Sequence, residues 1–219
     1  MNVYETISNQ VEKERENIIN FLIEFINQKS INPDRALPEE PGGEKLCQEW
    51  LRDQMAKMDV FNKIDIWELA SNRPNLVGVI GEEKKTDNAI MFNGHVDVVP
   101  VTKQQYKSWT IGSPWKAERI GDRIYGRGAS DMKSGITAFL WAAKILAEAK
   151  FSLEGSLITS INVGEESSNF DIGSRAIVRR GYRAPLLINA EPTNLIVCPA
   201  TKGAFFFKIS IPGQGAHVA

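Results

Sequence analysis

Short apolar runs alternate with segments of helical periodicity along most of this chain, and this alternation limits its possible folds more than any other feature. Short apolar runs bounded by Gly, Asn or Pro predict strands. The predicted strands are residues 60–69, 76–80, 89–92, 156–163 and 186–190. Apolar residues that recur at helical spacing predict helices. The predicted helices are residues 3–28, 46–58, 133–149 and 172–180.

The order of these elements predicts the fold class. Strands that are apolar along nearly their whole length are typical of sheets covered by helices on both faces. We therefore expect an α/β fold, a three-layer sandwich around a mostly parallel sheet. Residues 101–115 are polar and predict a long surface loop, and residues 117–126 predict a hairpin that turns at a Gly-Asp pair.

The charge balance excludes broad classes of partner. The chain has 26 basic and 27 acidic side chains and a net charge of -1. Such a chain lacks the extended positive field that nucleic acid or an anionic membrane surface attracts. The first residues have no apolar core, so we expect no signal peptide there, and the longest uncharged apolar stretch is far below the ~20 residues of a membrane span. We expect a cytoplasmic protein with no nucleic-acid and no membrane partner.

His95 stands in FNGHVDVVP, directly after the predicted strand at 89–92. Loops at the carboxyl ends of strands collect ligands in α/β sheets. Asp97 is two residues further on, and residues at this spacing point to the same side of an extended chain. This arrangement suits a metal-bound imidazole whose other ring nitrogen is held by a carboxylate. Taken alone, the segment favours a turn histidine beside a capping aspartate.

The segment GRGASDMKSG, residues 126–135, matches neither common phosphate-binding pattern. The Walker pattern requires Gly directly before Lys, but Met132 precedes Lys133. The dinucleotide fingerprint needs Gly where Asp131 stands, and a carboxylate there would repel pyrophosphate. A nucleotide-binding α/β protein is thus disfavoured. What remains is a loop that ends in one carboxylate, which alone also fits a helix N-cap.

Two further acidic segments follow predicted strands. Glu165 and Glu166 come after the strand at 156–163, and Glu191 comes after the strand at 186–190. Neighbouring residues of an extended chain face opposite ways, so one glutamate of the pair could bind metal while the other handles a proton. Taken singly, the pair Glu165 and Glu166 also fits a solvated charged loop, and Glu191 also fits a capping or turn carboxylate.

Together, these segments supply one His, one shared Asp and two Glu around one sheet. Such a nitrogen and oxygen donor set suits two divalent ions, zinc first, with cobalt or manganese as alternatives. Two ions that share a carboxylate and a water would lower the pKa of that water and polarise a carbonyl group.

The segments GHVDVVP, YGRGASDMKSG, GEES and NAEPT, in this order and spacing, resemble those of the zinc-dependent deacylases and exopeptidases typified by acetylornithine deacetylase, succinyl-diaminopimelate desuccinylase and carboxypeptidase G. The resemblance runs from about His95 through His217. It implies a zinc-peptidase-like catalytic domain, of which residues 1–199 form the N-terminal part. Residues 200–219 would open an α+β lid domain with its first strand.

The resemblance also implies an activity and a partner. The reaction is hydrolysis of the amide bond of an N-acyl amino acid or small peptide by two bound zinc ions. The complete protein would form a homodimer through its lid. Which acyl amino acid or peptide is cleaved does not follow, because substrate recognition in this family comes largely from lid and C-terminal residues.

The resemblance assigns four metal ligands. His95 and Glu191 would bind one ion, Asp131 would bridge both ions, and Glu166 would bind the second.

It assigns three further roles. Asp97 would orient His95. Glu165 would act as general base on the bridging water and then pass the proton to the leaving amine. His217 would reach the partner subunit's active site and steady the oxyanion.

Two departures from the family pattern qualify the expectation. Gly164 stands where the family often has Asp, and the family's further metal-binding histidine would lie beyond Ala219. We therefore expect an N-terminal fragment or truncated product, inactive or weakly active by itself. The alternative is a non-catalytic binding or regulatory module that keeps the metal cluster without the chemistry.

Overall fold

The computed structural model describes residues 2–82, 87–149, 154–203, 207, 209–210 and 212–213. Its centre is a five-stranded sheet in the order β1–β2–β6–β3–β7. The strands are β1 (Lys63–Ala70), β2 (Arg73–Ile80), β3 (Ile90–His95), β6 (Leu157–Asn162) and β7 (Leu186–Asn189). β3 is parallel to β6 and to β7, whereas β2 is antiparallel to β1 and to β6. All strands except β2 therefore run in one direction, which confirms the prediction of a mostly parallel sheet.

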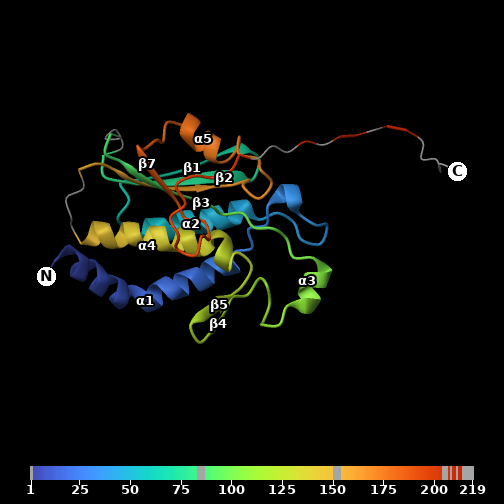
Figure 1. Cartoon of the computed structure of the whole chain (residues 1–219), viewed down its shortest axis with the longest axis horizontal. Helices are drawn as coiled ribbons and strands as arrows, with labels where there is room; N and C mark the ends of the chain where they lie inside the picture. The colour runs from blue at the N-terminus through green and yellow to red at the C-terminus, as the bar shows by residue number, and fades with distance from the viewer. Residues whose placement is uncertain are drawn as a thin grey trace.

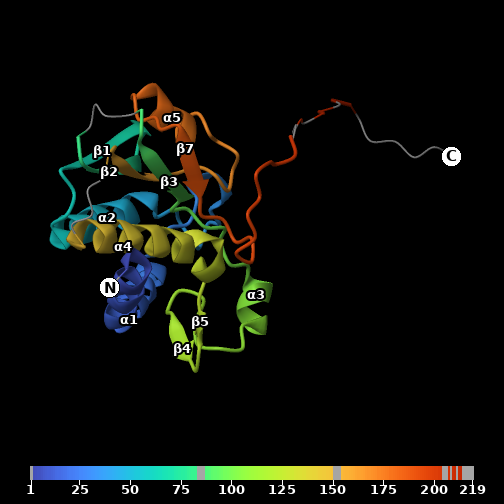
Figure 2. The same ribbon diagram turned by 60° about the vertical axis from the view of Figure 1, so that its left-hand side comes forward.

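Helices cover both faces of this sheet (Figure 1). α2 (Glu44–Met58) and α4 (Ser134–Glu148) pack on one face, and α5 (Ser174–Arg179) packs on the other. α1 (Val3–Asn27) lies outside α4, and Figure 2 shows the same layers from a second direction. The three-layer α/β sandwich predicted from the sequence is confirmed.

The burial of each strand follows its place in the sheet. β2 and β6 are buried at every position, because each has a neighbour at both edges and helices over both faces. β7 is an edge strand, and its apolar residues Leu186, Leu187 and Ile188 are exposed. The continuous apolar pattern therefore predicted full burial correctly for β2 and β6. It did not for β3, which is only partly buried, or for the edge strands β1 and β7.

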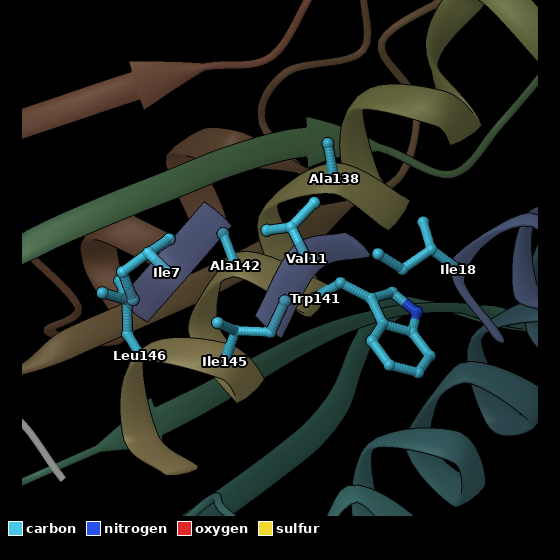
Figure 3. A pocket seen from close by; sticks show the side chains of 8 residues that line it. All are labelled: Ile7, Val11, Ile18, Ala138, Trp141, Ala142, Ile145 and Leu146. Atoms are coloured by element: carbon cyan, nitrogen blue, oxygen red, sulfur yellow. The ribbon is translucent and has the colours of Figure 1, made fainter. Parts of the chain in front are cut away.

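Aromatic side chains join α1 to the helices beneath the sheet. The Phe21 ring meets the Trp141 ring edge to face at 6.2 Å, and the Phe25 ring stacks on the Trp50 ring at 5.7 Å. Beside this contact, an apolar groove of about 360 Å³ runs between α1 and α4. Its wall includes Val11 and Trp141, and Figure 3 shows the eight side chains that line it. This groove lies on the side of α4 that faces away from the sheet.

The segment predicted as a surface loop contains the helix α3 (Lys103–Ser108), so the loop prediction is wrong there. Thr102 Oγ1 accepts a hydrogen bond from the Gln105 amide, and Gln105 Oε1 accepts one from the Thr102 amide. This reciprocal pair is a capping box, and it starts a helix even in a polar segment. The predicted hairpin is confirmed as β4 (Glu118–Ile120) and β5 (Arg123–Tyr125).

Part of the prediction falls on residues whose structure is not described. His217 and most of the expected lid strand lie outside the described residues. Within the described part of the chain, no helix combines the length and apolar character needed to cross a membrane.

Candidate metal centre

The carboxyl ends of two neighbouring strands place His95 beside Glu191. His95 is the last residue of β3, and the pairing of β3 with β7 sets Asn93 opposite Asn189. His95 and Glu191 each lie two residues beyond that pair, so they reach the same level at this edge of the sheet. Glu191 Oε1 is 3.8 Å from His95 Nε2.

Asp131 reaches the same point from the turn η2 (Ala129–Lys133), which precedes α4. Its Oδ1 lies 3.0 Å from His95 Nε2. Gly135 lets α4 begin close to the end of β7, because a Cβ atom there would lie 2.1 Å from the Ala190 carbonyl oxygen. No side chain caps α4, so Asp131 does not take the capping role that the sequence also allowed.

Lys133 anchors the other end of this turn. Its side chain is buried, and its Nζ donates hydrogen bonds to the carbonyl oxygens of Phe25 at 3.0 Å and Gln28 at 2.6 Å, at the end of α1. Gly128 has a positive φ of 86°, and a Cβ atom there would lie 3.2 Å from Lys133 Cδ. Asp131 is therefore held between the last turn of α1 and the end of β7.

Glu165 and Glu166 follow β6, the other parallel neighbour of β3. Glu165 Oε2 lies 3.7 Å from His95 Nε2. His95, Asp131 and Glu191 each offer a ligand atom within 4.8 Å of the other two. Glu166 stands outside this three-residue group, so three of the four predicted ligands converge in the described structure.

Asp97 contacts His95 mainly through its main chain. His95 Nδ1 is 2.8 Å from the Asp97 carbonyl oxygen and 3.8 Å from the carboxylate oxygen Oδ1. A carbonyl oxygen can only accept a hydrogen bond, so the Nδ1–H group of His95 donates to it. The other ring nitrogen, Nε2, faces Asp131. The Asp97 carboxylate instead accepts hydrogen bonds from Asn32 Nδ2 at 2.6 Å and from the main-chain amides of Glu165 and Glu166 at 3.4 and 3.1 Å.

A cavity of about 160 Å³ opens at this edge of the sheet. It is lined by Asn93, His95, Asn162, Glu165, Phe170, Ser174, Asn189 and Glu191. Its three asparagines are not among the site residues predicted from the sequence. Asn93 Nδ2 donates to Asn189 Oδ1 at 2.9 Å, and Asn93 Oδ1 accepts from Asn162 Nδ2 at 3.1 Å. The available signal was an Asn among the last three residues of each parallel strand β3, β6 and β7.

The site gathers negative charge around one imidazole. Burial by itself would lower the pKa of His95, but its hydrogen bond with Asp131 and the charges of the neighbouring carboxylates raise that pKa to about 9. Burial raises the pKa of all three glutamates of the site, and the hydrogen bond from His95 lowers the pKa of Asp131. A cation would relieve the repulsion among these carboxylates, and imidazole with carboxylate is a donor set for zinc, cobalt or manganese. The residues present therefore fit a divalent metal.

The raised pKa of His95 predicts how the stability of the metal-free chain depends on pH. Its pKa rises from 6.5 in the unfolded chain to about 9 in the folded chain. The contribution of His95 to the free energy of unfolding is therefore fully present below pH 6.5 and is lost as the pH rises through 9. This contribution is about 3 kcal/mol. Urea unfolding of the metal-free chain between these pH values should show this loss.

The matched variant is His95→Asn, which should remove most of the pH dependence. With saturating divalent metal the trend should reverse, because the metal binds the neutral imidazole. If His95→Asn shows the same pH dependence as the unmodified chain, the pH dependence does not come from His95.

Comparison with known proteins gives one family match. Residues 91–207 match the model of peptidase family M20/M25/M40. The chain is 30% identical over 194 residues to N-formyl-4-amino-5-aminomethyl-2-methylpyrimidine deformylase of Bacillus subtilis. The aligned region covers 87% of this chain and 42% of that protein. It is 31% identical over 209 residues to succinyl-diaminopimelate desuccinylase of Rickettsia akari, covering 92% and 52%. The chain thus spans about half, or less, of the length of these curated relatives.

Solved structures show the same fold at lower identity. The M20 family metallo-carboxypeptidase Sso-CP2 from Sulfolobus solfataricus superposes with a TM-score of 0.62 at 22% identity, over 79% of this chain and 37% of that one. Human carnosine dipeptidase 1 superposes with a TM-score of 0.65 at 15% identity, over 82% of this chain and 38% of that one.

Proposed function

The chain belongs to peptidase family M20/M25/M40, and on that basis we propose that it carries the catalytic half-site of a two-metal amidohydrolase. Membership implies a divalent metal and hydrolysis of amide bonds. The finer proposal is that zinc is the metal and that the substrate is an N-acyl amino acid or small peptide, as for acetylornithine deacetylase.

One observation carries this proposal. The side chains of His95, Asp131 and Glu191 come from three separate segments, yet their ligand atoms lie within 4.8 Å of one another. Glu165 lines the same cavity without belonging to that ligand group. A metal-binding group with one free carboxylate beside it is the arrangement that metal-assisted hydrolysis requires.

The roles of the residues follow from their places. Bound divalent ions would lower the pKa of a water and polarise the carbonyl of the substrate. His95 would bind metal through Nε2, because its Nδ1–H group donates a hydrogen bond to the Asp97 carbonyl oxygen. Glu165 would accept a proton from the water at Oε2 and later deliver it to the nitrogen of the leaving amine. Burial raises the pKa of Glu165, which favours this exchange of a proton near neutral pH.

The second metal site and the lid complete the proposal. Glu166 would bind the second ion, with Asp131 shared between both ions. Residues 200–219 would open a lid that mediates homodimerisation, and His217 would steady the oxyanion in the partner subunit. These assignments rest on the family resemblance. The names of the relatives, a deformylase and a desuccinylase, support removal of an acyl group from an amine.

The test is an amide hydrolysis assay on the protein as its gene encodes it. The protein is stripped with chelator and reloaded with zinc, cobalt or manganese. It is then incubated with N-formyl, N-acetyl and N-succinyl amino acids and with dipeptides, and the released amine is measured. We expect release that depends on metal and that a chelator abolishes. Metal binding without hydrolysis of any member of this panel would instead support the non-catalytic module.

A further inference from the structure

A buried ion-pair network adjoins the turn that carries Glu165, the candidate general base, and Glu166, the candidate ligand of the second ion. Arg73, the first residue of β2, is buried, and its Nε and Nη2 donate to the two carboxylate oxygens of Glu44 at 2.6 and 2.8 Å. Its Nη1 donates to Asp34 Oδ2 at 2.6 Å. Glu44 is the first residue of α2, and Asp34 lies in the short helix η1 (Pro33–Arg35). One guanidinium thus joins the starts of α2 and β2 to η1.

The same carboxylates bind residues 164–169, which we call the glutamate turn. The Glu44 carboxylate faces the Gly164 amide, and Asp34 Oδ2 accepts hydrogen bonds from Ser167 Oγ at 2.8 Å and from Asn169 Nδ2 at 3.5 Å. The carboxylate of Asp97 accepts hydrogen bonds from the next two main-chain amides of the turn, those of Glu165 and Glu166. The glutamate turn therefore rests on three carboxylates that come from three different segments.

Arg73 is the cation that balances this cluster. Within the described ranges of the chain, no other Lys or Arg forms an ion pair with Glu44 or Asp34. Burial raises the pKa of Glu44 to about 7 against the opposing effect of Arg73. Without Arg73, the Glu44 carboxylate would have to take up a proton or move toward water, and away from the Gly164 amide that it faces.

Stability alone is a weak reason for such a pair. Well-packed apolar residues of similar volume often stabilise a fold as much as a buried ion pair does. What the charged network adds is directed hydrogen bonding, because a bidentate Arg–carboxylate pair has a set geometry. The Glu44 oxygens are thereby held where the Gly164 amide meets them.

We propose that Arg73 is a positioning residue for the candidate active site. Through Glu44 and Asp34 it fixes the glutamate turn, and so the places of Glu165 and Glu166. The catalytic meaning of this inference rests on the proposed function, whereas the placement of the turn can be tested without it.

The test compares three variants of the protein as its gene encodes it. Arg73→Met combined with Glu44→Gln removes the ion pair without leaving an unpaired buried charge. Ser167→Ala leaves Arg73 and Glu44 in place and removes the hydroxyl that donates to Asp34 Oδ2 at 2.8 Å. The same hydroxyl accepts from Asn32 Nδ2 at 3.2 Å and donates to the Gly164 carbonyl oxygen at 3.3 Å, so these contacts are lost as well. This variant keeps the test open if the double variant does not fold. Arg180→Met is the matched control, because it removes another guanidinium that binds one carboxylate through two nitrogens, that of Asp65 at 2.8 and 3.0 Å.

Hydrogen–deuterium exchange of the metal-free protein reports the turn directly. We expect residues 164–169 to exchange about tenfold faster in the double variant, and several-fold faster in Ser167→Ala. The control should exchange as the unmodified protein does. After loading with Co²⁺, the double variant should show an altered visible spectrum of the bound cobalt. Its kcat should fall about tenfold while KM stays within about twofold.

Unchanged exchange in the glutamate turn would overturn the proposal. Faster exchange with the cobalt spectrum and kcat both unchanged would also overturn it, because Arg73 would then only stabilise the fold. If the unmodified protein hydrolyses nothing, the proposed function fails. The exchange rates and the cobalt spectrum then decide the role of Arg73 by themselves.

Discussion

Glu165→Gln is expected to lower kcat of the metal-loaded protein by about 10²–10⁴-fold, the usual contribution of a general acid–base group. The glutamine amide has the shape of the carboxyl group but cannot accept the proton of the water. The variant should keep its metal, because Glu165 is outside the group of converging ligand atoms. It should also keep its fold, because the turn is held through the Glu165 main-chain amide rather than through its side chain.

Turnover and metal content are measured on the same samples, by amine release and by elemental analysis. Glu24→Gln is the matched control, since Glu24 is an exposed glutamate on α1. It should leave both quantities unchanged. Near-native turnover in Glu165→Gln would show that the base is another residue. Loss of metal together with turnover would make Glu165 a ligand.

Asp131→Asn is expected to weaken binding of divalent metal by at least about 100-fold. Loss of a residue that merely orients a ligand costs about 10–100-fold, and loss of a ligand shared by two ions should cost more. Asp131 is also the closest carboxylate to His95, at 3.0 Å. In the metal-free chain the same change should therefore lower the pKa of His95 from about 9 toward its ordinary value.

Two measurements separate these effects. Competition with a chromophoric chelator gives the metal affinity, and NMR titration of the imidazole gives the pKa of His95. Asp122→Asn, in the exposed turn between β4 and β5, is the matched control and should change neither. A lowered pKa with unaltered metal affinity would mean that Asp131 pairs with His95 but is not a ligand.

Most helices and strands were predictable because their signals are local. The Ile136–Ile145 part of α4 is apolar over most of its circumference, and such a pattern predicts a buried helix wherever it occurs. The missed helix α3 was also local, since Thr102 and Gln105 form a recognisable capping box. The loop prediction failed there because the polarity of the segment was taken as the sign of a loop, and the capping box was overlooked.

The candidate site was predictable only as a set of residues. Each of His95, Asp131, Glu165 and Glu191 follows a strand or a glycine loop, which is a property of the sequence. Their distances depend on which strands are neighbours. β6, β3 and β7 lie side by side although long segments of chain separate them, and that order is a result of packing.

The partners of Asp97 show the difference most clearly. Spacing predicted that its carboxylate holds His95, but that carboxylate binds Asn32 and the amides of Glu165 and Glu166. Likewise, nothing in the segment around Arg73 indicated a role beside the glutamate turn. A buried carboxylate accepts from whichever donors the folded backbone brings near it, and those donors lie far away in the chain.

The amino-acid order by itself thus determined the kinds of element, the layered α/β class and the chemical types gathered at strand ends, because periodicity and residue chemistry act over a few neighbours. Only the tertiary structure decided that the β3–β7 register brings His95 level with Glu191, and that Arg73 pairs with Glu44 and Asp34 beside the glutamate turn. Pairing, burial and charge compensation are set by contacts between remote segments, and these exist only after the chain has folded.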